Sequence, residues 1–193
     1  FRSLSLASAI DFSPLESFAE SEMKRANVPG AAIAVVVNGE IAFTKGFGIA
    51  NVDTGDPVKA DMLFRIGSTT KMFTAATLVS LAEEGKLKLD VPVGNYVTNL
   101  APKIARATSH QYLTHTAGLA DETFMEGPHE ETALGEWTRG LKDSLAFTEP
   151  GKIYSYSNPC YWVAGFVAES VGGKRYADLV AERVLKPCGM TRS

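Results

Sequence analysis

The residues Phe64-Arg65-Ile66-Gly67-Ser68-Thr69-Thr70-Lys71 mark the point at which the chain changes character. From here apolar residues recur with helical spacing over 69–84, and Gly85 ends the run. Only small polar residues interrupt the apolar set, so we expect this helix to be buried on nearly all sides. Ser68 precedes Lys71 by three residues, and residues three apart share a helix face. The lysine amine can therefore reach the serine hydroxyl.

This serine–lysine pair suggests nucleophilic chemistry. A serine hydroxyl is a weak nucleophile unless a base takes its proton, and a desolvated lysine can be that base. The helix N-terminus adds positive potential and backbone N–H groups beside the reacting atom. The spacing alone is a weak signal, because Ser21-Glu22-Met23-Lys24 repeats it within a charged helical stretch. A capping Ser68 with Lys71 extended into water is the alternative.

A second polar cluster, Tyr156-Ser157-Asn158, leads directly into a helix predicted over 159–171. A phenol beside an ammonium can lose its proton below its usual pKa, act as a base and return the proton to a leaving group. An asparagine side chain offers a donor and an acceptor for a substrate amide and for the lysine. A helix-capping Asn158 with Tyr156 packed beneath it is the alternative.

Before residue 64 the sequence predicts a helix packed on a β-hairpin. Ser13-Pro14-Leu15-Glu16 combines a capping serine, a proline and a glutamate at the spacing of a helix start. Strands are predicted over 31–37 and 40–47, joined by Asn38-Gly39, a strong hairpin signal. The first strand is apolar on both faces, which is typical of a strand covered on both sides. The fold class is therefore α+β.

The sheet in this chain is incomplete. No further strand is evident after Val52, and two strands are too few for a stable sheet. We expect an N-terminal helix with the first strands over 1–66 and a helical lobe over 67–193. The remaining strands should come from a C-terminal continuation or from a second chain.

Composition excludes several classes of function. The 193 residues carry 19 Lys and Arg against 22 Asp and Glu, a net charge of −3, without a basic run, so we do not expect nucleic-acid binding. The longest apolar stretch, Ala31–Val37, is too short for a transmembrane segment. With 45% hydrophobic residues, the chain can form a sizeable core.

The histidines invite a Ser-His-Asp interpretation with His115 as the base. The chain has no Gly-x-Ser-x-Gly elbow, which disfavours an α/β-hydrolase. We expect His115 to brace the turn at Gly118 instead. His110 and His129 have no such context.

The other candidates have structural explanations. Cys160 and Cys188 are expected to pack as small hydrophobic side chains, and the two tryptophans, Trp137 and Trp162, to lie in the core. The acidic run from Asp121 to Glu131 has irregular spacing, so we expect a solvated rim there and no metal site. No cofactor is indicated.

Several segments together resemble the serine β-lactamase and penicillin-binding protein family, in particular its class C β-lactamase and D-alanyl-D-alanine carboxypeptidase-like branch. Phe64–Lys71 is similar to the family's nucleophile segment, and the stretch from Leu113 to Leu119 to its "LTHTSGL" segment. The similar positions near the second motif and the chain's end are Pro150-Gly151, Tyr156-Ser157-Asn158, Tyr161, Gly165 and Pro187-Cys188-Gly189-Met190.

The resemblance implies a serine hydrolase that forms an acyl-enzyme with an amide or ester substrate: a β-lactam, a D-amino-acid peptide or amide, or a carboxylic ester. Ser68 would be the acylated nucleophile, and Lys71 and Tyr156 a proton-shuttling pair. Asn158 would bind the substrate amide and hold Lys71. The resemblance also favours an extracytoplasmic location.

One family feature has no counterpart. The third motif, Lys-Thr-Gly or His-x-Gly on a strand, is not matched by Lys45-Gly46 or Lys174-Arg175. A non-catalytic, penicillin-recognising sensor is the alternative function. Such a binder would not need the proton relay that Ser68, Lys71 and Tyr156 suggest.

Overall fold

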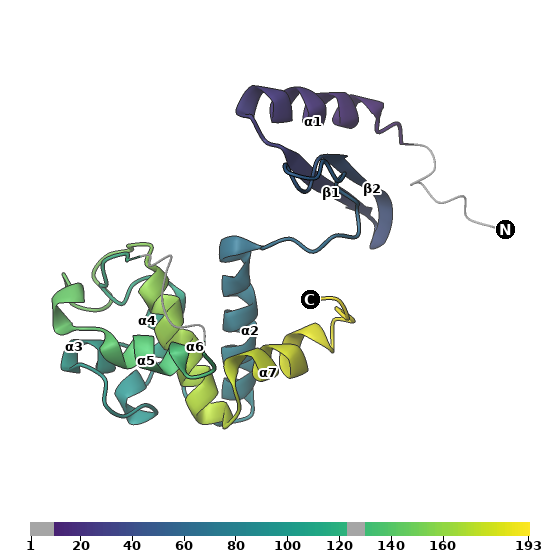
Figure 1. Ribbon diagram of the computed structural model, residues 1–193. Coiled ribbons are helices and arrows are strands. Elements are labelled where there is room, and N and C mark those ends of the chain that lie inside the picture. The colour runs from purple at the N-terminus through teal and green to yellow at the C-terminus, as the bar shows by residue number, and fades with distance from the viewer. Residues whose placement is uncertain (1–9, 123–129) are drawn as a thin grey trace. The chain divides into compact units, whose positions relative to one another are not determined.

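The computed structural model describes residues 10–122 and 130–193 and divides into two compact units at the Phe64–Arg65 bond (Figure 1). The N-terminal unit holds one helix and a hairpin, and the C-terminal unit is helical. The elements are α1 (Ser13–Ala26), β1 (Gly30–Val37), β2 (Glu40–Gly48), η2 (Gly67–Thr69), α2 (Thr70–Glu83), η3 (Val93–Asn95), α3 (Pro102–Ala105), α4 (Ser109–Leu113), α5 (Ala133–Gly140), η4 (Asp143–Leu145), α6 (Asn158–Gly172), α7 (Tyr176–Val180) and η5 (Ala181–Leu185).

The predicted hairpin is confirmed. β1 and β2 pair antiparallel from Gly30 opposite Gly48 to Val37 opposite Glu40, with an irregularity after Val35. Asn38 and Gly39 have φ angles of 53° and 81°. Two positive φ angles give the tight turn whose twist matches that of the flanking strands.

Helix α1 is attached to the second strand of this hairpin. The ring of Phe12 stacks on Phe43 with centroids 4.8 Å apart, and Lys45 forms an ion pair with Glu16. The prediction that Ser13 caps this helix was wrong. Ser13 is itself the first helical residue, and its N–H donates to Asp11 Oδ1 at 2.9 Å, so the acceptor comes from two residues earlier.

The hairpin is less covered than its sequence predicts. Along β1, half-buried and exposed residues alternate, and Val36 is 62% exposed. On β2, Ile41 is 72% exposed. Within the described residues the sheet has two strands, so part of the apolar surface of β1 has no neighbour.

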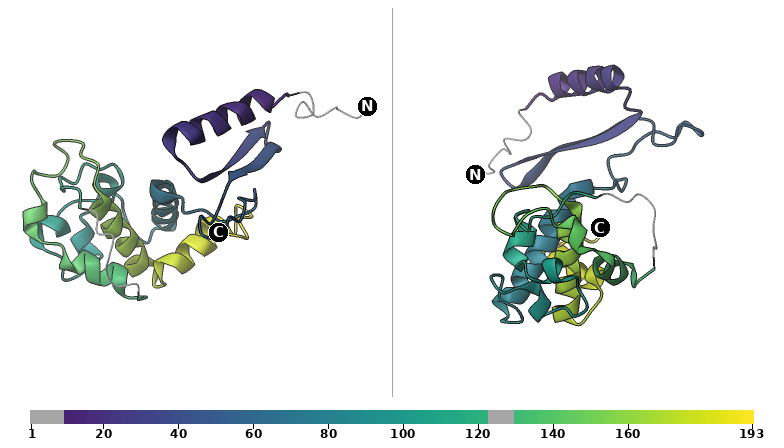
Figure 2. Two further views of the ribbon diagram at one scale, coloured as in Figure 1. Left: turned by 45° about the horizontal axis from the view of Figure 1, so that its top comes forward. Right: turned by 90° about the vertical axis from the view of Figure 1, so that its left-hand side faces the viewer.

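The helical unit is built around α6. This helix has eight buried residues and packs against α2, α4, α5 and α7, and Figures 1 and 2 show α2 running beside α6. Pro159 occupies the first turn, where a proline costs no hydrogen bond, and Gly173 ends the helix at φ 65°. The predicted helix over 159–171 is therefore confirmed.

Helix α2 corrects one expectation. Its buried residues, Thr74, Thr77, Leu78 and Leu81, form a single stripe at helical spacing. Met72, on another face, is 62% exposed. The apolar sequence predicts burial on nearly all sides, but in the described unit α6, α7 and η5 pack on α2 and leave residues such as Met72 exposed.

The structure also shows how far the cysteines and tryptophans are buried. Cys160 is buried, as expected, whereas Cys188 is exposed, contrary to expectation, because it lies beyond the last helical segment. Trp137 and Trp162 are half-buried and pack on each other, with ring centroids 5.7 Å apart. No helix within residues 10–122 and 130–193 combines the length and apolarity needed to cross a membrane.

Candidate active site

Ser68 lies on the short turn η2, which continues directly into α2. Lys71 follows one turn later, and its Nζ donates a hydrogen bond to Ser68 Oγ at 3.1 Å. The Ser68 side chain is exposed, whereas Lys71 is partly buried. A hydroxyl at the mouth of a helix, open on one side and bonded to an amine on the other, is accessible to an incoming substrate.

The loop before α6 brings Tyr156 and Asn158 to the same place. Tyr156 Oη lies 2.6 Å from Ser68 Oγ, and either oxygen can be the donor. Lys71 Nζ donates a second hydrogen bond to Asn158 Oδ1 at 2.8 Å. The structure thus joins all four site residues that the sequence predicts in one hydrogen-bonded group.

The lysine also lies over aromatic rings. Its Nζ is 4.7 Å from the ring centre of Tyr156 and 5.5 Å from that of Tyr161. The nearby Lys71 ammonium, and then the hydrogen bond with Ser68, lower the pKa of the Tyr156 phenol below its usual value. Burial instead raises the pKa of Tyr161, whose hydroxyl donates to the carbonyl of Leu113. Of these two phenols, Tyr156 is the one suited to give up a proton.

His115 is close to this group but has a different bonding pattern from a catalytic base. Its Nδ1 accepts the backbone N–H of Ser157 at 3.1 Å, and its ring centre lies 4.5 Å from that of Tyr156. Burial, and then the charge of Lys71, lower the pKa of the imidazole. In a Ser-His-Asp triad Nδ1 donates a hydrogen bond to the carboxylate, whereas the Nδ1 of His115 is an acceptor, so this geometry disfavours the triad alternative. The expected brace at Gly118 is replaced by a brace on the Ser157 backbone.

The sequence predicts a solvated acidic rim, and Asp121 is exposed; in addition, its Oδ1 accepts the N–H of Asn158 at 2.7 Å. Local sequence patterns could not reveal this contact, because the two residues are 37 positions apart. Residues 123–129 of the acidic run, His129 among them, lie outside the described residues. Within the described ranges no group of His, Cys, Asp and Glu could hold a metal ion.

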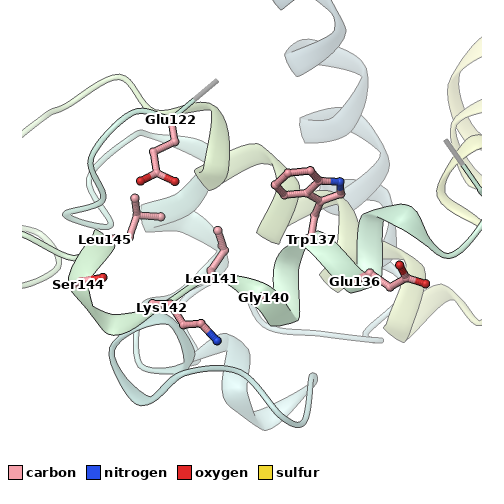
Figure 3. A pocket seen from close by; sticks show the side chains of 8 residues that line it. All are labelled: Glu122, Glu136, Trp137, Gly140, Leu141, Lys142, Ser144 and Leu145. Atoms are coloured by element: carbon pink, nitrogen blue, oxygen red, sulfur yellow. The ribbon is translucent and has the colours of Figure 1, made fainter. Parts of the chain in front are cut away.

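A hollow of about 360 Å³ lies elsewhere in the helical unit (Figure 3). Trp137, Leu141 and Leu145 supply its apolar wall, and Glu122 and Lys142 are among its polar lining residues. None of the four hydrogen-bonded site residues lines it.

Residues 15–193 match the profile of the family described as beta-lactamase. The chain belongs to this family. Protein flp of Staphylococcus aureus (strain MRSA252) is 28% identical to it over 185 residues, which cover 93% of this chain and 37% of that protein. The chain therefore spans less than half the length of this curated relative and covers part of the family's domain.

Solved structures extend the similarity to the fold. The octameric penicillin-binding protein homologue from Pyrococcus abyssi is 31% identical, with a TM-score of 0.83 over 95% of this chain and 44% of that chain. Three further solved structures are similar to this chain: a class C beta-lactamase in complex with cefoxitin, the D-alanine carboxypeptidase AmpC from Burkholderia cenocepacia and the D-amino acid amidase from Ochrobactrum anthropi. Their identities are 27–28% and their TM-scores 0.75–0.77, over 92–94% of this chain and 49–51% of each of theirs. The resemblance read from the sequence motifs, including its class C and carboxypeptidase-like branch, is confirmed.

Proposed function

We propose that the protein is a serine hydrolase in which Ser68 is transiently acylated. The observation that carries this proposal is the hydrogen-bonded group of Ser68, Lys71, Tyr156 and Asn158. Ser68 Oγ has the phenol oxygen of Tyr156 at 2.6 Å and the amine of Lys71 at 3.1 Å, an arrangement that solvent exposure of a serine does not by itself explain. This arrangement matches a nucleophile with a proton acceptor beside it.

In the first step, Ser68 Oγ attacks the carbonyl carbon of an amide or ester. The hydroxyl proton passes to the Tyr156 oxygen in its ionised form, which the neighbouring Lys71 ammonium stabilises. A tetrahedral intermediate forms, and its negative charge rests on the former carbonyl oxygen. The lowered pKa of Tyr156 supports this role, because the most effective general base has a pKa near the working pH.

In the second step, the intermediate collapses and the bond to the leaving group breaks. Tyr156 returns the proton to the departing nitrogen or oxygen, and an ester between Ser68 and the acyl group remains. Water then attacks the carbonyl carbon of this ester and gives up a proton to Tyr156. The bond between Ser68 Oγ and the acyl carbon breaks, Tyr156 passes the proton to Oγ, the carboxylic acid leaves, and Ser68 and ionised Tyr156 are regenerated. Asn158 would orient a substrate amide while its Oδ1 holds the Lys71 amine.

The oxyanion needs donors of its own. The backbone N–H of Ser68, on the turn η2 that leads into α2, would supply one. By the family resemblance the second would come from the third-motif strand, which we expect outside this chain.

The substrate class is an amide or ester of a carboxylic acid. The related structures include an amidase for D-amino acids, a D-alanine carboxypeptidase and a beta-lactamase by their names. For this chain we propose the same range: a D-amino-acid peptide or amide, a carboxylic ester or a β-lactam.

Covalent labelling tests the nucleophile. The complete protein is treated with a fluorophosphonate probe, digested and weighed by mass spectrometry. We expect the probe's mass on the peptide that contains Ser68 and none after Ser68→Ala. Ser21→Ala is the matched control, because Ser21 has the same spacing to a lysine and lies in α1. Labelling at Ser21 or Ser157 would contradict the assignment.

Turnover separates the enzyme from the sensor. Steady hydrolysis of p-nitrophenyl acetate or nitrocefin, lost in Ser68→Ala, is the result expected of an enzyme. Stoichiometric acylation that never recovers would instead support the penicillin-recognising sensor.

A further inference from the structure

We propose that His115 is a positioning residue of this site: it fixes the backbone of the Tyr156-Ser157-Asn158 segment through its unprotonated Nδ1 and thereby makes acylation sensitive to acid. The inference rests on the proposed function. It assigns His115 a role distinct from that of a general base.

The segment from His115 to Asp121 holds the loop at successive backbone and side-chain groups. The His115 carbonyl accepts the N–H of Ser155 at 2.9 Å, and its Nδ1 accepts that of Ser157 at 3.1 Å. The Ser157 hydroxyl donates to the Ala120 carbonyl at 3.0 Å. Asp121 Oδ1 completes the series by accepting the N–H of Asn158.

These contacts hold the residues before and after Tyr156, and the Tyr156 side chain itself contacts Ser68. Ser157 is fully buried, so its N–H has no water to replace the imidazole nitrogen. An unpartnered buried N–H is costly, and the loop would shift to satisfy it. Because the Tyr156 oxygen must stay 2.6 Å from Ser68 Oγ, a small shift of this backbone separates base and nucleophile.

The ring of His115 is enclosed by the same site. Its centre lies 4.5 Å from that of Tyr156, 5.1 Å from Tyr161 and 6.0 Å from Tyr154. Two charged groups act on it: the Lys71 ammonium disfavours a second proton, whereas the Asp121 carboxylate favours one.

Protonation of His115 has two consequences. Nδ1 would become a donor and could no longer accept the Ser157 N–H, and a second positive charge would arise beside Lys71. Because burial and Lys71 lower the pKa of His115, the ring is neutral at neutral pH and gains its proton only in acid. The rate of acylation should therefore fall as the pH drops through the pKa of His115.

Two substitutions of His115 distinguish the contribution of its hydrogen-bond acceptor from that of its aromatic ring. His115→Asn keeps an oxygen acceptor near the position of Nδ1 but does not titrate, and asparagine tolerates the positive φ of 57° at this position. His115→Phe keeps an aromatic ring but has no acceptor. His110→Asn is the matched control, because His110 is an exposed histidine of α4.

The measurement is the rate at which the fluorophosphonate modifies Ser68 in the complete protein, followed from about pH 5 to about pH 9. We expect His115→Phe to be slower by about tenfold at neutral pH, the factor that corresponds to one hydrogen bond. We expect His115→Asn to keep the neutral rate within about threefold and to lose less of it in acid than the wild type. His110→Asn should follow the wild type throughout.

Two outcomes would overturn this role. One is a wild-type rate in His115→Phe, and the other is an acid limb in His115→Asn that superimposes on that of the wild type. Both leave the proposed nucleophile intact, because wild-type Ser68 is still labelled. Absence of labelling in the wild type would instead remove the proposed function, and this inference with it.

Discussion

The pKa of the Tyr156 phenol is shifted in the opposite direction to that of three other tyrosines of the helical unit. The Lys71 ammonium lowers its pKa, whereas burial raises the pKa values of Tyr112, Tyr161 and Tyr176. Of these four side chains, Tyr156 therefore ionises first. Its proton is the one that the proposed mechanism moves.

This difference can be measured by an alkaline titration followed by the ultraviolet absorbance of tyrosinate. We expect one tyrosine to ionise below the usual value near pH 10 and the component to vanish in Tyr156→Phe. In Lys71→Ala it should move to higher pH, because the stabilising charge is gone. Tyr161→Phe is the control, and it should keep the early component. An early component that survives Tyr156→Phe would contradict the assignment.

Lys71 and Tyr156 should act as one unit. Lys71→Ala or Tyr156→Phe alone should slow acylation of Ser68 by about 10²–10⁴-fold, the usual contribution of a positioned acid or base. The double variant should be little slower than the slower single one, because each change disables the same proton transfer. Lys24→Ala, in the Ser-x-x-Lys repeat of α1, should have the wild-type rate. If the two losses multiply, the residues work independently.

At the scale of single elements, the glycine that ends α6 allows the energetic cost of a left-handed backbone conformation to be measured. Gly173 ends the helix at φ 65°, and a Cβ there would meet open space. Gly140, the last residue of α5, also has open space but no positive φ.

We therefore expect different effects of two alanine substitutions on the free energy of unfolding. Gly173→Ala should lower it by about 1 kcal/mol, because a side chain disfavours the left-handed conformation. Gly140→Ala should leave it unchanged or raise it by about 0.5 kcal/mol, because alanine has less backbone freedom in the unfolded chain. Urea denaturation of both variants measures the difference, and equal losses would refute this explanation.

The elements themselves were largely predictable from local sequence. Asn38-Gly39 fixed the hairpin turn, and Pro159 with Gly173 bounded α6, since each residue acts through its own backbone angles. The exposure of Met72 was not predictable, because the burial of a helix face depends on which neighbours the chain supplies.

The site was predictable only in part. The spacing of Ser68 and Lys71 within one helical turn is local, and so it can be read directly. The contacts of His115 and Asp121 with the loop before α6 join residues 42 and 37 positions apart. Helical or strand periodicity carries no information about such distant partners. The roles assigned to Ser68, Lys71, Tyr156 and Asn158 remain predictions.

At the scale of the whole molecule, the hairpin leaves apolar surface open. Val36 and Ile41 are 62% and 72% exposed, and a two-stranded sheet has unpaired edges. Together with the partial coverage of relatives, this supports the expectation that further strands complete the sheet.

We expect the polypeptide of residues 1–193, expressed alone, to self-associate. Its Ser68 should react about 10²–10³-fold more slowly than in the complete protein, the usual cost of losing one oxyanion donor. Light scattering and the labelling rate measure the two effects. Ile41→Lys should reduce association without restoring the rate. A soluble monomer that reacts at the full rate would show that residues 1–193 supply the whole site.

The different exposure of the two cysteines allows local opening of α6 to be measured with thiol reagents. Burial raises the pKa of the Cys160 thiol to about 11, whereas Cys188 is exposed. A thiol reagent near neutral pH should therefore find one fast sulfhydryl in this chain and one that reacts only when α6 detaches from the unit. The slow reaction gives the frequency with which the start of α6, next to the loop that carries Tyr156, opens. A fluorophore on Cys188 can be followed without altering any residue of the proposed site.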